Sequence, residues 1–427
     1  MLKRYLQRAP DSVFILFATL SAFGAYFCMY AFRKPFTVAT YEGIGFWGDE
    51  LAYKSALVIS QVVGYALSKF IGIKVISELK SHYRVVLFLL LIGLAEVALL
   101  LFAIVPAPWN VILMLFNGLP LGMIWGIVFS YLEGRRFTEI LGAGLSTSFI
   151  IASGAVKSIG QWLMLHFGVS EFWMPAVTGA IFILPLLLFA YLLEQIPPPT
   201  QEDIDLRTER KPMTGQERVR LFRNYAPGLV LLIAFYTLLT AYRDFRDNFA
   251  AEIWSALGFD GKPYIFTASE TPIAILVLLM VGATMWIKDN HLALRVYLWL
   301  ILGGAVLVGV STVLFSNGIL NGALWMVLVG LGLYMAYILY NCILFDRMIA
   351  AFRYKSNAGF LIYVADAFGY LGSVAILFFK DFGRPNLSWI EFFTQASYML
   401  AVGGVLLLIS AIWYFSRRVE PARRHLS

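Results

Sequence analysis

Long apolar stretches, separated by short polar segments, recur along the whole chain. A helix needs about 20 consecutive, mainly apolar residues to cross the ~30 Å hydrocarbon core of a bilayer. The stretches are continuous rather than alternating, which favours membrane helices over the strands of a barrel. The pattern predicts twelve spans, at roughly 12–39, 51–78, 84–106, 108–132, 138–168, 172–194, 226–258, 264–287, 291–315, 319–350, 355–380 and 389–416.

One hydrophilic segment is much longer than the others. It covers residues 195–225, begins IPPPTQEDIDLRTER and is rich in proline and charge. Such a segment is typical of a solvated linker between domains. We therefore expect an all-α integral membrane protein of twelve transmembrane helices, with a six-helix half at 1–194, a cytoplasmic linker at 195–225 and a second, pseudo-symmetric half at 226–427.

The composition agrees with a membrane protein. The chain is 60% hydrophobic and 14% charged, with a mean hydropathy of +0.76, whereas a soluble domain carries about 25% charged residues. Loops other than the linker are short, so we expect no catalytic domain and no enzyme activity.

The two cysteines, Cys28 and Cys342, lie in apolar stretches, and the four histidines lack the spacing of metal ligands. Neither a disulfide, a metal nor a cofactor is therefore expected. The first apolar stretch is too long for a cleavable signal peptide and should remain as a helix.

The basic residues predict the orientation. With the N-terminus in the cytoplasm, most of the 33 lysines and arginines lie at cytoplasmic ends, and the outer segments hold only Lys54, Lys262, Lys380 and Arg384. This is the positive-inside pattern for an even number of spans with both termini in the cytoplasm. The net charge of +7 therefore reflects the orientation of the chain in the membrane, and nucleic acid is not an expected partner. We expect a monomer in a lipid bilayer, in a bacterial cytoplasmic (inner) membrane.

Charged residues inside the spans need an explanation, because each costs about 2.5–3.5 kcal/mol at the bilayer centre. Such residues mark ligand or ion pathways, or pair with one another. They are Arg33, Lys34, Lys69, Glu96, Lys157, Arg243, Asp244, Arg246, Asp247, Glu270 and Asp366.

Span one carries a polar face. Tyr26, Tyr30, Arg33 and Thr37 recur at helical spacing, and Arg33 and Lys34 have no acid nearby in the sequence. The planar guanidinium of arginine suits a bidentate oxyanion. The pattern favours a small anionic substrate as the missing partner, against the alternative that Arg33 snorkels to the outer interface.

Span seven repeats the pattern with Tyr236, Thr240, Arg243 and Asp247. Arg243 and Asp247 are four residues apart and could form a structural pair. Arg246 would then be the freer cation and is the preferred ligand of the two.

The other charges leave alternatives open. Lys157 follows the small residues of ASGAVKSIG and is a candidate for the binding cavity, whereas Lys69 either lines the cavity or snorkels. Glu96 is either a partner of a lysine or a protonated acid. Asp366 and Glu270 either carry coupled protons or balance buried cations. Glycine pairs such as Gly118/Gly122 and Gly142/Gly144 are expected to pack helices together.

An internal repeat links the two halves. FRKPFTVATYEGIGFWG (32–48) and FRDNFAAEIWSALGFDG (245–261) share six identical positions at a spacing of 213 residues, half of the 427-residue chain. One identity pairs Arg33 with Arg246. A chain of two similar halves, each with an arginine at the same place, suggests a transporter with an anion site shared between them.

Four segments carry a family resemblance: GAYFCMYAFRKPF (24–36), VGYALSKFIG (63–72), NGLPLGMIWG (117–126) and AFGYLGSVA (367–375). With the twelve-helix plan, they resemble the organophosphate:phosphate antiporter branch of the major facilitator superfamily. The resemblance implies the major facilitator fold and exchange of a phosphorylated metabolite for phosphate by alternating access. It also implies a phosphate clamp of Arg33 with Arg246 or Arg243, supported by Lys34 and Lys69.

The chain also departs from that branch. GIKVISELKSHYR (72–84) lacks the Asp-Arg pair usual after the second span, and LSTSFIIASGAVKSIG (145–160) lacks the branch's helix-five histidine. Two alternatives to phosphate-ester exchange therefore stay open. One is a proton-coupled carrier of carboxylates or sugars, and the other is a membrane sensor of a phosphorylated metabolite.

Overall fold

The structure, a computed structural model, describes residues 2–46, 51–77, 79–133, 135, 137–200, 203, 215–352 and 358–424. These residues are almost entirely helical, which confirms the all-α prediction, with one two-residue strand pair, β1 (Gly45–Phe46) and β2 (Leu51–Ala52). Within the described residues, eleven helices are long and apolar enough to cross a membrane. Gly48 of the first repeat copy and residues 201–202 and 204–214 of the predicted linker lie outside the described residues.

Each predicted span corresponds to helix in the described part of the chain. The first six correspond to α2 (Asp11–Tyr30), α3 (Tyr53–Ser77), α4 (Arg84–Ile104), α5 (Val111–Leu121) with α6 (Ile124–Phe129), α7 (Thr138–Phe167) and α8 (Met174–Glu194). The second six correspond to α10 (Gly215–Asn248), α12 (Tyr264–Thr284), α13 (Asn290–Ser316), α14 (Gly322–Leu339) with α15 (Phe345–Ala351), α16 (Ala358–Phe378) and α17 (Trp389–Arg424). Shorter elements are α1 (Leu2–Leu6), α11 (Ala250–Ala256), the 3₁₀ turns η1 (Pro35–Val38) and η2 (Ser81–Tyr83), and the π-helical turns η3 (Tyr340–Leu344) and η4 (Phe379–Gly383).

Three helix boundaries, on α10 and α2, differ most from the prediction. α10 begins at Gly215, inside the segment predicted as linker, and ends at Asn248 rather than at 258. α2 ends at Tyr30 rather than at 39. The apolar run continues past Tyr30, so hydropathy alone gave no sign of the end.

The end of α2 has a local cause. The amides of Ala31, Phe32 and Arg33 donate to carbonyls three residues back, at 3.0–3.1 Å, which tightens the last turn. Pro35 then has no amide to continue the ladder and opens η1. Arg33 and Lys34 therefore lie in a turn, and the predicted helical face that joins Tyr30 to Thr37 is wrong beyond Tyr30.

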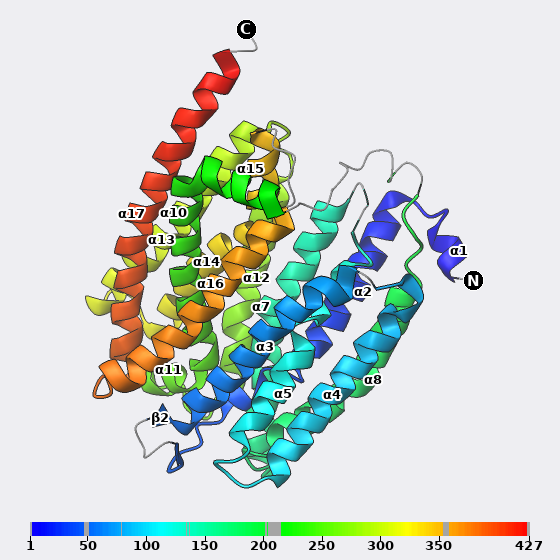
Figure 1. Ribbon diagram of the computed structural model, residues 1–427. Coiled ribbons are helices and arrows are strands. Elements are labelled where there is room, and N and C mark those ends of the chain that lie inside the picture. The colour runs from blue at the N-terminus through cyan, green and yellow to red at the C-terminus, as the bar shows by residue number, and fades with distance from the viewer. Residues whose placement is uncertain are drawn as a thin grey trace. The chain divides into compact units, whose positions relative to one another are not determined.

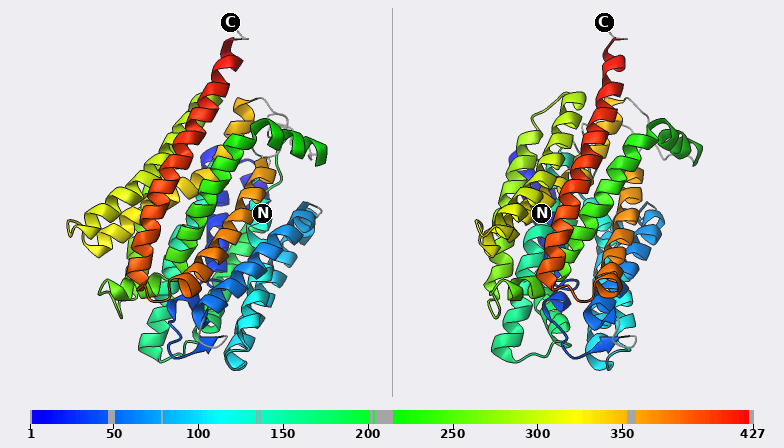
Figure 2. Two further views of the ribbon diagram at one scale, coloured as in Figure 1. Left: turned by 60° about the vertical axis from the view of Figure 1, so that its left-hand side comes forward. Right: turned by 90° about the vertical axis from the view of Figure 1, so that its left-hand side faces the viewer.

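The chain divides into two compact units. The first joins residues 1–207 with 245–274 and 377–389, and the second joins 208–244, 275–376 and 390–427. In the first unit α3 packs on α5, α4 packs on α5 and α8, and α2 packs on α7 and α8 (Figure 1). In the second unit α13 packs on α14, and α17 runs beside α10 (Figure 2), where the rings of Tyr242 and Phe393 stack at 4.8 Å.

Glycines set the close contact between α3 and α5. A Cβ on Gly118 would lie 2.2 Å from the carbonyl oxygen of Gln61, and one on Gly122 would lie 2.6 Å from that of Tyr65. Gly64 faces the carbonyl oxygen of Leu115 in the same way, at 2.2 Å. Side chains at these positions would force the two backbones apart, which confirms the predicted packing role of Gly118 and Gly122.

Candidate functional site

The turn after α2 is held by two buried amide side chains. The end of the helix leaves the carbonyls of Phe32 and Arg33 without helical partners. Asn117 on α5 donates to the oxygen of Phe32 at 2.9 Å, and Gln61 on α3 donates to that of Arg33 at 3.0 Å. Gln61 also donates to Asn117 at 2.7 Å. Both amides are buried, so they fix the backbone that presents Arg33 and Lys34.

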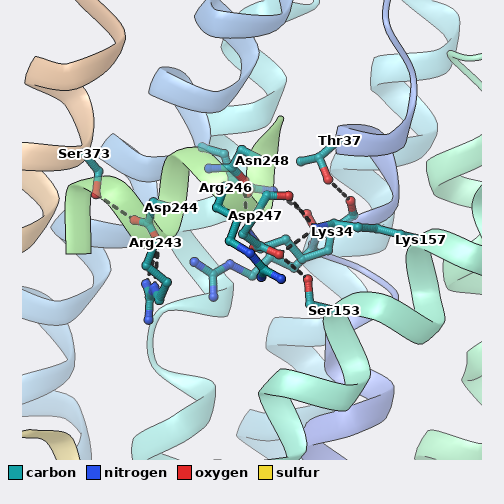
Figure 3. Close-up of polar contacts among 12 residues, drawn as sticks. Lys34, Thr37, Ser153, Lys157, Arg243, Asp244, Arg246, Asp247, Asn248 and Ser373 are labelled. Carbon is teal, nitrogen blue, oxygen red and sulfur yellow. Dashed lines mark hydrogen bonds and ion pairs between the residues drawn. The ribbon is translucent and has the colours of Figure 1, made fainter. Parts of the chain in front are cut away.

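Two lysines from distant parts of the first unit share one carboxylate. Lys34 forms an ion pair with Asp247 at the end of α10, and Lys157 on α7 pairs with the same carboxylate at 2.5 Å (Figure 3). Ser153, one turn before Lys157, donates to Asp247 at 2.5 Å. Lys34 also donates to Asn248 at 2.8 Å. Both lysines are nearly inaccessible, at 4% and 3% exposure, so the carboxylate neutralises charges that water does not reach.

A further buried pair extends this cluster. Arg246 on α10 donates to Glu270 on α12 at 2.8 Å. Arg246 is 3% and Glu270 is 9% exposed. The cations Lys34, Lys157 and Arg246 contribute +3 and the carboxylates of Asp247 and Glu270 contribute −2, so these five groups carry a formal charge of +1. We call these five residues the central charge cluster.

The cluster corrects three expectations about the predicted charges. Lys34 has an acidic partner, which lies 213 residues away and so escaped a search for local acids. Arg246, expected to be the freer arginine of α10, pairs with Glu270, just as Arg243 pairs with Asp244. Asp247 does not pair with Arg243, since its carboxylate binds the two lysines.

The repeat also has a different local structure in its two copies. Arg33 lies in the turn after α2, whereas its counterpart Arg246 lies in the last turn of α10. The guanidinium of Arg33 stacks over the ring of Tyr65 at 3.9 Å and lies 5.8 Å from the ring of Tyr30. The rings of Tyr30 and Tyr26, both predicted to bind substrate, pack edge-on at 5.7 Å. Lys69 lies 5.6 Å from the same Tyr65 ring. The structure thus brings Arg33 and Lys69 to one aromatic ring.

Another ion pair of the first unit lies within electrostatic reach of Lys157. Lys54 at the start of α3 pairs with Glu252 on α11 at 2.5 Å. α11 lies outside the candidate membrane helices. Burial raises the pKa of Glu252, although the Lys54 ammonium acts in the opposite direction.

The second unit holds its own polar cluster on α10, α14 and α16. Arg243 pairs with Asp244 at 2.5 Å and stacks over Tyr337 at 3.7 Å. Ser373 donates to Asp244 at 2.7 Å. Asp366, predicted as a coupling or charge-balancing acid, accepts a hydrogen bond from Tyr236 at 2.7 Å. Tyr236 and Tyr337 stack at 5.8 Å, so the same rings link the arginine to Asp366.

Sequence reasoning missed several neutral polar residues of the site. Gln61, Ser153 and Asn248 each form a hydrogen bond with a predicted site residue or its backbone, and Asn117 bonds Phe32, the residue before Arg33. A search limited to charges inside spans passes over them. Amide side chains in apolar runs, as in FNGLP and SQVVG, could have indicated these site residues, because a buried amide needs hydrogen-bond partners just as a buried charge does. Among the described residues, no group of three or more His, Cys, Asp or Glu side chains could hold a metal.

Comparison with protein families gives one match, and it covers most of the chain. Residues 35–418 match the model described as a family of unknown function, DUF5690. The chain belongs to this family. No curated protein matches this DUF5690 chain.

Solved structures share the fold of the DUF5690 chain. A D-xylose–proton symporter matches with a TM-score of 0.63 at 14% identity, covering 94% of this chain and 97% of its own. The nucleoside transporter NupG matches with a TM-score of 0.62 at 16% identity, covering 94% and 98%. A bacterial homologue of the human drug peptide transporters PepT1 and PepT2 matches with a TM-score of 0.61 at 12% identity, covering 98% and 100%. The fold is therefore that of major facilitator transporters, and the chain is a multi-pass membrane protein.

Proposed function

We propose that this protein is a secondary transporter of a small organic anion, which it moves by alternating access between the halves 1–194 and 226–427. The central charge cluster carries the proposal. Lys34, Lys157 and Arg246 come from three separate parts of the chain and are each buried, and with Asp247 and Glu270 they carry a formal charge of +1. A group of buried side chains in which cations outnumber acids favours an anionic ligand. The shared fold supports transport in general.

The finer proposal is a phosphate ester exchanged for inorganic phosphate. The sequence resemblance of the first span and the planar guanidinium of Arg33, held over Tyr65, support a phosphate group as the recognised part. Arg246 is preferred over Arg243 as the second ligand because it belongs to the central charge cluster, whereas Arg243 pairs with Asp244 in the polar cluster of the second unit.

A proton-coupled carrier of carboxylates or sugars is the second candidate. Buried acids in both units favour it, namely Glu270 in the first and Asp366 in the second. Asp366 accepts a hydrogen bond from the neutral hydroxyl group of Tyr236. A solved structure of this fold is that of a proton symporter, although that likeness supports the fold alone.

Counterflow in proteoliposomes separates the two candidates. Purified protein is reconstituted into vesicles loaded with inorganic phosphate, and uptake of radiolabelled phosphate is competed with external phosphate esters and carboxylates. Phosphate-ester exchange predicts labelled uptake that requires internal phosphate and falls when esters are added. Uptake of a carboxylate that ignores internal phosphate but collapses with the pH gradient would replace this proposal with the second candidate.

A further inference from the structure

Glu96 on α4 is a buried acid that the central charge cluster does not use. It is 9% exposed, and its Oε2 atom has no hydrogen-bond partner in the part of the chain that the structure describes. It faces inward, on the same side of α4 as the buried Ile92 and Leu99, whereas Leu94 and Val97 are exposed. No ion pair is seen for Glu96 among the described residues.

Gly179 leaves space in the first unit for the carboxyl group of Glu96. A Cβ added to Gly179 on α8 would lie 2.2 Å from Oε2 of Glu96 and 3.1 Å from the ring of Phe32. Any other residue at position 179 would occupy the space of the carboxyl. The glycine thus lets a carboxyl group pack between α4, α8 and the residue that precedes Arg33.

Among the described elements that pack most extensively on α4, none brings an ionisable side chain to the level of Glu96. These elements are α5, α6, α8 and η2. α5 and α6 have no ionisable side chain. The ionisable residues of α8, of η2 and of α4 itself lie about three helical turns or more from the level of Glu96, which is roughly 18 Å along a helix. They are Tyr191, Glu194, His82, Tyr83 and Arg84. The cations Arg33 and Lys34 directly follow Phe32 in the sequence.

A hydrogen-bond bridge ties Glu96 to that cationic turn. Asn117 donates both to the oxygen of Phe32 at 2.9 Å and to the oxygen of Ala95, next to Glu96, at 3.1 Å. A change of charge at Glu96 would therefore act on the same backbone that presents Arg33 and Lys34.

We propose that Glu96 is the proton-binding site that links anion transport to proton movement. The inference rests on the proposed transport function. An ionised carboxylate without a counter-charge in an apolar interior is strongly unfavourable, so Glu96 is neutral in this arrangement and holds one proton. In the cycle it takes that proton from water on one side of the membrane and releases it to water on the other. Once ionised, it attracts the cationic turn through the contact with Phe32.

The test compares driven uptake with counterflow in proteoliposomes, with inorganic phosphate as the probe. With inorganic phosphate inside the vesicles, as exchange requires, an imposed pH gradient should raise the amount of labelled phosphate that wild-type vesicles accumulate. Glu96→Gln should lose at least tenfold of this accumulation and keep counterflow, which needs no net proton movement. Glu96→Asp, which keeps an acid, should retain part of the driven uptake. Glu42→Gln, an exposed loop acid, is the matched control and should match wild type.

The outcomes separate this inference from the proposed function. No labelled uptake in any wild-type assay would refute transport of phosphate itself. Wild-type counterflow without any response to the pH gradient would overturn the proton link, whatever the variants do. Gradient-driven accumulation that survives in Glu96→Gln would likewise overturn the role of Glu96 and leave the transporter in place.

Discussion

At the scale of single residues, the lysines of this protein's buried ion pairs join distant parts of the chain, whereas Arg243 pairs with its neighbour Asp244. The sequence showed which charged residues lie inside the spans, and all of them lie in the helices or in the turn after α2. It did not show their partners, because a buried ion pair such as Lys34 with Asp247 depends on tertiary contact. Only local rules such as spacing by four residues can be read from a single sequence, and that rule gave the wrong partner for Arg243.

Asp247 is the residue on which the cluster depends most for stability. Asp247→Asn would leave Lys34 and Lys157 buried without their shared carboxylate, and breaking a buried pair costs about 3–5 kcal/mol. We expect a clear fall in the apparent melting temperature in detergent. Lys157→Met should cost less alone, because Lys34 still balances Asp247. In the double variant the two costs should not add, with a coupling of about 0.5–3 kcal/mol. Strictly additive shifts would show that the pair is not formed.

At the scale of elements, hydropathy predicted helix in every span and the order of the helices, but not the break after Tyr30. That break depends on Pro35 and on capping by Gln61 and Asn117, which come from other helices. It determines where Arg33 and Lys34 point. The sequence therefore allowed the charged residues of the candidate site to be predicted, but not their pairing or the direction in which they point.

Two glycines of neighbouring helices test the role of close helix contact. Gly118→Ala places a methyl group against the carbonyl oxygen of Gln61, at 2.2 Å, and should separate α3 from α5. We expect it to destabilise the protein by about 1–3 kcal/mol, the usual cost of overpacking. Gly93→Ala on α4 meets open space and should be neutral or stabilise by up to about 1 kcal/mol through helix propensity. Thermal unfolding of both variants gives the comparison, and equal shifts would contradict the packing account.

At the scale of the whole molecule, the basic residues predict that both termini lie in the cytoplasm. A single cysteine at Glu42 should then react with a membrane-impermeant thiol reagent added to intact cells, because this exposed loop residue lies on the outer side. A cysteine at the exposed Arg417 should react only after the membrane is opened. The variants are made without Cys28 and Cys342. The reverse labelling pattern would invert the topology, and labelling of both from outside would rule out an odd number of spans between them.

The central claim is that buried cations bind the transported anion, and phosphate counterflow tests it most directly. Arg33→Ala and Arg246→Ala should each lower phosphate-dependent exchange by at least about tenfold, since a hydrogen bond to a charged group contributes about 1.5–3 kcal/mol. Arg246→Ala with Glu270→Gln, which removes the orphaned carboxylate, should stay inactive, and the exposed Arg223→Ala should exchange like wild type. All variants should insert into the membrane normally. Wild-type exchange rates in both arginine variants would contradict the account.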